Sequence, residues 1–152
     1  MPKKSKNKEK LQKRLVHFAR KHLGKPYKYG ARPWEAPRVF DCSSFVQYLY
    51  KRIGIDLPRT ALEQAHFGRK VDIKKEKLQP GDLIFLKGKW GHYDPQFPQG
   101  VGHVAIYVGD GKIIHARWRE NKDSLSAGKV QEDKVKRILN RKDLVIVKRI
   151  LK

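Results

Sequence analysis

One residue of this chain is suited to nucleophilic chemistry. Cys42 is the single cysteine in 152 residues, and a cysteine thiolate readily attacks carbonyl carbons. Asp41 can cap a helix, and apolar residues follow at helical spacing, so we place Cys42 in the first turn of a helix. Free N–H groups and the helix dipole stabilise an anion there, so the thiol should lose its proton more readily than a free cysteine. A lone helical cysteine is more often a small buried hydrophobe, so position alone leaves both roles open.

A nucleophilic cysteine needs a base, and the base needs an orienting partner. His103 and His115 lie in two segments of strand composition on either side of Gly109-Asp110-Gly111, which predicts a hairpin. A two-residue loop would put the two histidines on opposite faces. A three-residue loop pairs Ala105 with His115 and sets the histidines diagonally on one face, about 7–8 Å apart at the backbone. A Cys–His–His relay is therefore possible if the loop has three residues.

The other histidines, His17, His22, His66 and His92, are interpreted as ordinary polar residues. A zinc site formed by His92, His103 and His115 is the alternative use of the histidines. It lacks a compact helical two-histidine motif and leaves Cys42 without a role. A single cysteine also excludes an intrachain disulfide and a Cys-x-x-Cys site.

The elements expected to position these residues are helices first and strands afterwards. Helices are predicted over Glu9–Leu23, from Cys42 to Ile53, and briefly from Ala61, where Thr60 and Glu63 form a capping-box pattern. Strands are predicted over Asp82–Leu86, His103–Val108, Lys112–Trp118 and Leu144–Ile150. This order favours an α+β fold with an antiparallel sheet.

Two further segments are expected to lie outside these elements. Residues 1–8 are interpreted as a basic flexible N-terminus, ahead of a single domain over residues 9–152. Residues 119–142 are polar and charged, and hold at most a short helix around Asp133–Leu139.

The charge of the chain is unusual, with 36 Lys and Arg against 15 Asp and Glu, a formal +21. Such a field attracts polyanions, and nucleic acid, anionic lipid and acidic wall polymers are all compatible with it. A non-catalytic module that binds polyanions or nucleic acid is therefore the alternative function, supported by Trp34, Trp90 and Trp118 beside basic residues. The cations are scattered along the chain and form no recognised nucleic-acid motif, so we do not expect nucleic acid to be a partner. We expect the protein to be a monomer.

Five motifs, in order, resemble the NlpC family of cell-wall cysteine peptidases. They are Gly24–Gly30, Asp41–Tyr48, Leu57–Thr60, Leu78–Leu83, and the histidine segments Gly102–Tyr107 and Ile114–Ala116. The resemblance runs from about Lys10 to the C-terminus. It implies a papain-like α+β fold, in which a helix carries the cysteine against a sheet that carries the histidines.

The resemblance also implies roles for these residues. Cys42 would attack the carbonyl, His103 would move the proton and His115 would hold His103. Tyr27 and the Cys42 N–H would stabilise the oxyanion, and the neighbouring oxyanion or substrate residues would be Asp41, Ser43 and Arg59. No metal or organic cofactor is needed. The expected reaction is hydrolysis of stem peptides of peptidoglycan, typically between D-γ-glutamyl and a diamino acid.

The sequence departs from the family pattern at Ser44, where glycine is common, and in two long aromatic loops, Arg32–Arg38 and the segment with Trp90, Tyr93 and Phe97. Both loops should lie near the cleft. No signal peptide or transmembrane span is visible. We expect action in the cell envelope or outside the cell, with a cytoplasmic stage before release if the protein comes from a phage. The +21 charge could hold it on anionic wall polymer.

Overall fold

The computed structural model describes residues 3–89, 91–118 and 128–152, and its centre is one antiparallel sheet. The six strands lie in the order β1-β6-β2-β3-β4-β5. Their bounds are Arg69–Lys70, Leu83–Leu86, His103–Gly109, Lys112–Trp118, Gly128–Lys134 and Leu144–Arg149, from β1 to β6. The helices are α1 (Lys3–Lys21), α2 (Cys42–Lys51), α3 (Ala61–Gln64) and α4 (Lys136–Leu139), with a 3-10 turn at Pro33–Glu35. The predicted α+β class with helices on an antiparallel sheet is confirmed.

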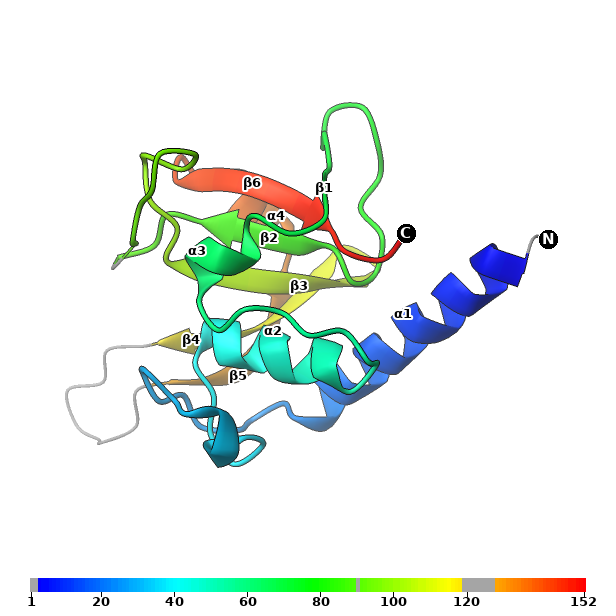
Figure 1. The fold of residues 1–152 in the computed structure, drawn as a ribbon, viewed down its shortest axis with the longest axis horizontal. Helices are drawn as coiled ribbons and strands as arrows, with labels where there is room; N and C mark the ends of the chain where they lie inside the picture. Colours follow the sequence, from blue (N-terminus) through cyan, green and yellow to red (C-terminus); the bar gives the residue numbers. More distant parts are fainter. Residues whose placement is uncertain (1–2, 90, 119–127) are drawn as a thin grey trace.

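The sheet is covered on both faces, which explains its apolar central strand. All four residues of β2, Leu-Ile-Phe-Leu, are buried. Leu83 and Phe85 join the larger core with residues of α2, which runs alongside β3 in Figure 1. Ile84 and Leu86 point to the other face, into a smaller core shared with Ile138 of α4. A strand buried on both faces reads as a continuous apolar run.

Helix α1 begins at Lys3, earlier than the predicted start at Glu9. Lys, Asn and Glu at this end need no packing to stay helical on a solvated surface, and Lys and Glu are good helix formers. The first turns project away from the rest of the fold in Figure 1, while Leu15 and Ala19 anchor the later turns in the core. Flexibility of residues 1–8 stays a prediction.

Strand β5 lies in the segment where no strand was predicted. Its sequence, Gly-Lys-Val-Gln-Glu-Asp-Lys, has one buried apolar residue, Val130. An edge strand needs only one apolar face and is commonly protected by charges, so its composition is close to that of a loop. The short helix predicted around Asp133–Leu139 is present as α4, but it begins at Lys136, because Asp133 and Lys134 belong to β5. Part of the predicted loop, residues 119–127, lies outside the described residues.

The β3–β4 hairpin has the register that was expected to place His103 and His115 on one face, but its turn differs from the one considered. Its turn has two residues, Asp110 and Gly111, both with positive φ (52° and 72°), so the three-residue loop that was given as the condition for the relay is not formed. Gly109 pairs with Lys112, but Ile106 pairs with Ile114, because Val108 is an extra residue that forms a β-bulge. Continued along the strands, this register sets His115 opposite Ala105 and diagonal to His103. The two histidines therefore share a face.

A buried ion pair ties the start of β2 to the end of β6. The Arg149 guanidinium donates from Nε to Asp82 Oδ1 at 2.8 Å and from Nη2 to Oδ2 at 2.9 Å. The two residues are 8% and 1% exposed. The hydroxyl of Tyr50 on α2 donates to the carbonyl of Gly81, next in the chain to Asp82. The segment around Gly81 and Asp82 therefore joins helix, sheet and C-terminus.

Replacing Asp82 with alanine should destabilise the fold, because Arg149 would lose its two bonds to the buried carboxylate and keep, among the described carboxylates, only the more exposed Glu76, 3.3 Å away. We expect Asp82→Ala to lower the free energy of unfolding by about 3–5 kcal/mol, measured by urea denaturation. Asp56→Ala is the matched control, since Asp56 is exposed, and it should change stability by about 0.5 kcal/mol or less. A cost for Asp82→Ala as small as that of the control would contradict this role for the pair.

Candidate active site

Cys42 is the first residue of α2, as predicted, and a reciprocal cap fixes that helix start. Asp41 Oδ1 accepts a hydrogen bond from the Ser44 N–H at 2.8 Å, and the Asp41 N–H donates to Ser44 Oγ at 2.9 Å. Ser44, at the position where the resemblance led us to expect glycine, thus completes a capping box. Figure 1 shows that α2 begins at the end of the sheet where β3 starts and β4 finishes.

The thiol of Cys42 lies against the first residues of β3. The side chain is 7% exposed, and Sγ lies 3.8 Å from the carbonyl oxygen of Gly102, to which the thiol donates. The backbone N–H of Val104 is also directed at the sulfur. Gly102 and Val104 flank His103, so the sulfur packs beside the backbone that carries the predicted base. Within the described part of the chain, the thiol bonds to this carbonyl and not to an imidazole.

The thiol is less acidic than the sequence suggested. Burial raises the pKa of Cys42 to about 12, and the negative charge of Asp41 acts in the same direction. The N–H groups of Val104 and Ser43 and the charge of Arg59 oppose this rise without cancelling it. The expectation of a readily ionised thiol is therefore wrong for the resting structure. Desolvation outweighs the helix start, because the sulfur is enclosed by the sheet on which α2 packs.

His103 and His115 form a hydrogen-bonded relay that ends on a carboxylate. His103 Nε2 lies 2.7 Å from His115 Nδ1, and His115 Nε2 lies 2.8 Å from Asp133 Oδ2. Asp133 also accepts a hydrogen bond from the Gln131 amide at 2.6 Å. Asp133 is two residues along β5 from Gln131, which pairs with His115, so it reaches the imidazole from a diagonal position.

The relay selects one tautomer for each ring. Burial would raise the pKa of Asp133, but the hydrogen bonds from Gln131 and His115 outweigh it and hold that pKa below its ordinary value. An ionised Asp133 only accepts, so His115 carries its proton on Nε2 and presents Nδ1 as an acceptor. His103 then donates from Nε2. Its Nδ1 is left without a proton, which is the state that a base requires.

Both imidazoles are neutral at pH 7. Burial lowers the pKa of His103 well below its ordinary value, and the charges of His115, Arg141 and Arg117 add to this. Burial also lowers the pKa of His115, against the opposing hydrogen bond to Asp133. The resting site thus combines a neutral thiol with a neutral base, in place of a thiolate–imidazolium pair.

Asp133 is the site residue that the sequence analysis missed. It fell in a segment interpreted as polar and without a strand, so nothing aligned it with His115. Gln131 and Asp133 are separated by one residue, Glu132, which is the spacing of side chains on one face of a strand. This spacing was the signal in the sequence that could have indicated Asp133. It becomes informative only when β5 is paired with β4.

The residues expected on the oxyanion or substrate side form one network beside Cys42. Arg59 Nη2 lies 2.6 Å from Asp41 Oδ2, and Arg59 Nη1 donates to Ser43 Oγ at 2.9 Å. Burial raises the pKa of Tyr27, followed by the charges of Cys42 and Asp41, so its hydroxyl stays protonated and within electrostatic reach of the sulfur.

Two adjoining cavities, each of about 360 Å³, meet at this site. One is lined by Cys42 together with Asp41, Ser43 and Arg59. The other is lined by the relay, His103, His115 and Asp133. Tyr27 and Gly102 line both. The nucleophile and the base therefore face neighbouring compartments that share a boundary.

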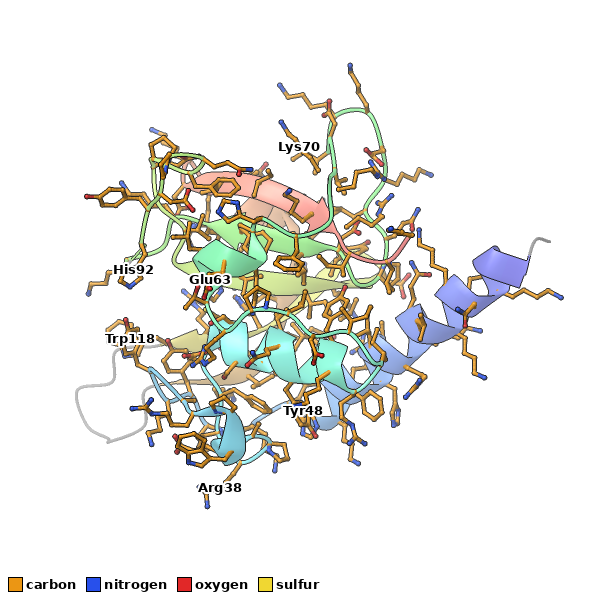
Figure 2. All side chains as sticks on the ribbon, viewed as in Figure 1. Arg38, Tyr48, Glu63, Lys70, His92 and Trp118 are labelled. Carbon is orange, nitrogen blue, oxygen red and sulfur yellow. The ribbon has the colours of Figure 1, made fainter. Side chains whose placement is uncertain are left out.

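The remaining histidines do not extend the relay. His92 is exposed and lines the Cys42 cavity, at the same end of the molecule as Trp118 in Figure 2. His22 packs against aromatic rings, and His66 binds Asp94 at 2.6 Å. No cluster of three or more potential metal ligands occurs among the residues that the structure describes, so the proposed zinc site of His92, His103 and His115 is not formed. Of the two aromatic loops, Trp34 and Tyr93 are exposed, whereas Trp90 lies outside the described residues.

Comparisons with known proteins agree on one family. The NlpC/P60 family model matches residues 24–142. The probable endopeptidase p60 of Listeria innocua is 38% identical over 103 residues, which are 68% of this chain and 19% of that protein. The gamma-D-glutamyl-L-lysine dipeptidyl-peptidase of Bacillus cereus is 39% identical over 102 residues, 67% of this chain and 27% of that protein. The chain thus spans about a fifth to a quarter of the length of these relatives.

A solved structure supports the same fold. The peptidoglycan hydrolase RipB from Mycobacterium tuberculosis superimposes with a TM-score of 0.69 at 28% identity. The match covers 100% of this chain and 69% of the solved chain.

The raised pKa of Cys42 predicts the pH dependence of its alkylation. The thiolate is the reactive form, so a raised pKa leaves little of it at pH 7, and its fraction grows as pH rises. We expect slow labelling by iodoacetamide at pH 7 and a rate that rises about tenfold per unit up to about pH 10. Mass spectrometry of the labelled protein gives the rate, and Cys42→Ala gives the blank. A rate independent of pH from about 5 to 8 would indicate an ion pair instead.

Asp133 should act by orienting His115. We expect Asp133→Asn to lower kcat on a cleaved peptide about tenfold to hundredfold, less than the loss of about 10⁴ known for a carboxylate bonded directly to a catalytic base. The ¹⁵N NMR signal of His103 Nδ1 should change from the unprotonated type to a mixture. Glu132→Gln, the same charge change on the opposite face of β5, is the control. Unchanged His103 tautomers in Asp133→Asn would refute the orienting role.

Proposed function

The chain belongs to the NlpC/P60 family, and on that premise we propose that it is a cysteine peptidase of peptidoglycan stem peptides. The bond proposed is the amide between D-γ-glutamyl and a diamino acid. The observation that carries the proposal is the relay from Asp133 through His115 to His103, whose neighbour Gly102 contacts the Cys42 sulfur. The names of the B. cereus and M. tuberculosis proteins support this substrate class.

In the proposed reaction, His103 Nδ1 removes the thiol proton as the sulfur attacks the scissile carbonyl. The hydrogen bond of the thiol must pass from the Gly102 carbonyl to this nitrogen first. A new C–S bond forms, and the carbonyl electrons move to oxygen. The N–H of Cys42 and the protonated hydroxyl of Tyr27 would stabilise this oxyanion. Because Tyr27 has a raised pKa, it can donate a hydrogen bond throughout the neutral pH range.

The second half of the reaction releases the two products in turn. The oxyanion collapses, the C–N bond breaks, and the proton on His103 goes to the leaving amine. The acyl group stays on Cys42 as a thioester. Water then attacks the thioester while His103 accepts its proton, and the thiol is restored. His115 and Asp133 keep His103 in one tautomer and accommodate its transient positive charge.

Attachment to the wall is a separate part of the proposal. The formal charge of +21 would hold the chain on anionic wall polymer, in a manner weakened by salt. The relatives' names favour a place of action in the cell envelope or outside the cell. None of the described helices is long and apolar enough to cross a membrane.

Cleavage of a defined stem peptide tests the proposed function. L-alanyl-γ-D-glutamyl-diamino acid peptides should be cut at the γ-glutamyl bond, as read by mass spectrometry of the fragments. Cys42→Ala should lower the rate by about 10⁴-fold or more, because it removes the nucleophile. Thermal unfolding of the variant checks that the fold is intact.

Two results would reject the enzyme. One is equal cleavage by Cys42→Ala. The other is no cleavage of any wall peptide together with no labelling of Cys42 by a thiol-directed probe even at about pH 10, where its thiolate fraction is larger. In the second case, salt-sensitive binding to nucleic acid by the intact chain would favour the non-catalytic polyanion-binding module.

A further inference from the structure

The cavity that holds the histidine relay is also lined by four cations. They are Lys89, Arg117, Arg137 and Arg141. Asp133 is the one carboxylate among its described lining residues, and it is already bonded to His115 and Gln131. We propose that this cavity is the subsite for the leaving amine and that it selects amines carrying a free carboxylate. This inference rests on the proposed peptidase function.

The neighbouring cavity shows that the cations are not spread evenly over the site. Its described lining residues include two cations, Arg32 and Arg59. Arg59 is bonded to Asp41, which lines the same cavity, so the positive charge of Arg59 is largely cancelled by the negative charge of Asp41. The relay cavity has four cations against Asp133, and even with Arg141 bonded to Asp143 outside the lining, the lining carries more positive than negative charge. A general attraction by the +21 chain would not distinguish the two compartments.

Arg117 is the cation placed best to bind a ligand beside the base. It lies two residues beyond His115 on β4, so both side chains leave the same face of the sheet. Its charge lowers the pKa of both His103 and His115, which places it within electrostatic reach of the relay. It makes no hydrogen bond or ion pair with any described residue. No described residue therefore competes with a ligand carboxylate for its guanidinium.

The other cations surround the same space from different elements. Arg141 is held in place by two hydrogen bonds to Asp143, both of 2.8 Å. Arg137 is the second residue of α4 and lies 3.6 Å from Asp133, with a side chain that is 72% exposed. Lys89 Nζ lies 5.1 Å from the centre of the Trp118 ring. Charges from three segments thus converge over the relay.

The direction of proton transfer identifies which part of the substrate enters this cavity. The acyl part becomes bonded to Cys42, which lines the other cavity. The leaving amine must receive a proton from His103, which lines the cationic one. The amine product therefore lies against His103, within reach of Arg117. A guanidinium binds a carboxylate through two parallel hydrogen bonds, and an amide or an ammonium group cannot replace that carboxylate.

The predicted substrate is a stem peptide whose diamino acid keeps its carboxylates free. Diaminopimelate differs from lysine by a second carboxylate at the far end of its side chain. The cationic cavity should favour diaminopimelate over lysine and over amidated diaminopimelate. Lysine and diaminopimelate both carry a side-chain ammonium, so the discrimination rests on the extra carboxylate, which offsets the repulsion of that ammonium by the cavity.

A matched pair of tripeptides tests this specificity. One is L-alanyl-γ-D-glutamyl-meso-diaminopimelate with both diaminopimelate carboxylates free, and the other has both as carboxamides. We expect the wild type to favour the diacid in kcat/KM by about tenfold or more. Arg117→Gln should lower kcat/KM about tenfold for the diacid and about twofold or less for the diamide. The two monoamides identify which carboxylate is bound.

Lys74→Gln is the control, since it removes one exposed cation from a loop that does not line this cavity. It should leave the ratio of the two kcat/KM values unchanged. Equal kcat/KM for diacid and diamide in the wild type would overturn the inference. An equal loss on both substrates in Arg117→Gln would also overturn it, because Arg117 would then act through the relay.

A binding measurement separates this inference from the proposed function. Free meso-diaminopimelate and its diamide are titrated into the Cys42→Ala protein, with NMR signals of the relay histidines as the readout. Tighter binding of the diacid, weakened by Arg117→Gln, supports the anion subsite even if neither tripeptide is cleaved. Equal affinities reject the subsite, whereas absence of cleavage alone rejects the peptidase.

Discussion

The hydrogen bond between His103 and His115 depends on a single extra residue in β3. Without the bulge at Val108, the two-residue turn at Asp110 and Gly111 would pair Ile106 with His115. The two imidazoles would then leave opposite faces of the sheet, because side chains alternate along a strand. With the bulge, Nε2 and Nδ1 lie 2.7 Å apart. The tautomer of the base and the contact with Asp133 both follow from this one shift of register.

Burial, more than the net charge of the chain, determines the chemistry of the site. A formal +21 would favour a thiolate if charges acted over long distances, but salt screens exposed charges beyond about 10 Å. The nearest charges to the sulfur largely cancel, since Arg59 is bonded to Asp41. Desolvation then keeps both Cys42 and His103 neutral. The charge excess acts instead on the far side of His103, where the relay cavity is open to a ligand.

What could be predicted from the sequence was local. The start of α2 follows from Asp41, and β2, β3, β4 and β6 follow from apolar or β-branched runs with turn residues between them. Strand β5 was missed because an edge strand with one buried valine has the composition of a loop, and Asp133 was missed with it. The acidity of Cys42 was misjudged for a related reason. A helix start is visible in the sequence, whereas enclosure of the sulfur by β3 is a property of the assembled fold.

The motifs that resemble the family combine chemical and architectural roles, and the sequence alone does not separate them. Asp82 is bonded to Arg149 in the interior, and Gly81 has a φ of 101° and little space for a side chain beside Tyr50 and Leu15. Arg59 holds Asp41 and Ser43 on either side of the nucleophile. These residues touch none of the relay atoms, yet they position the helix and strands that carry Cys42 and His103. The likeness of such a motif is therefore evidence for a common framework, whereas preference among substrates depends on residues outside the motifs, such as Arg117 at the edge of the relay cavity.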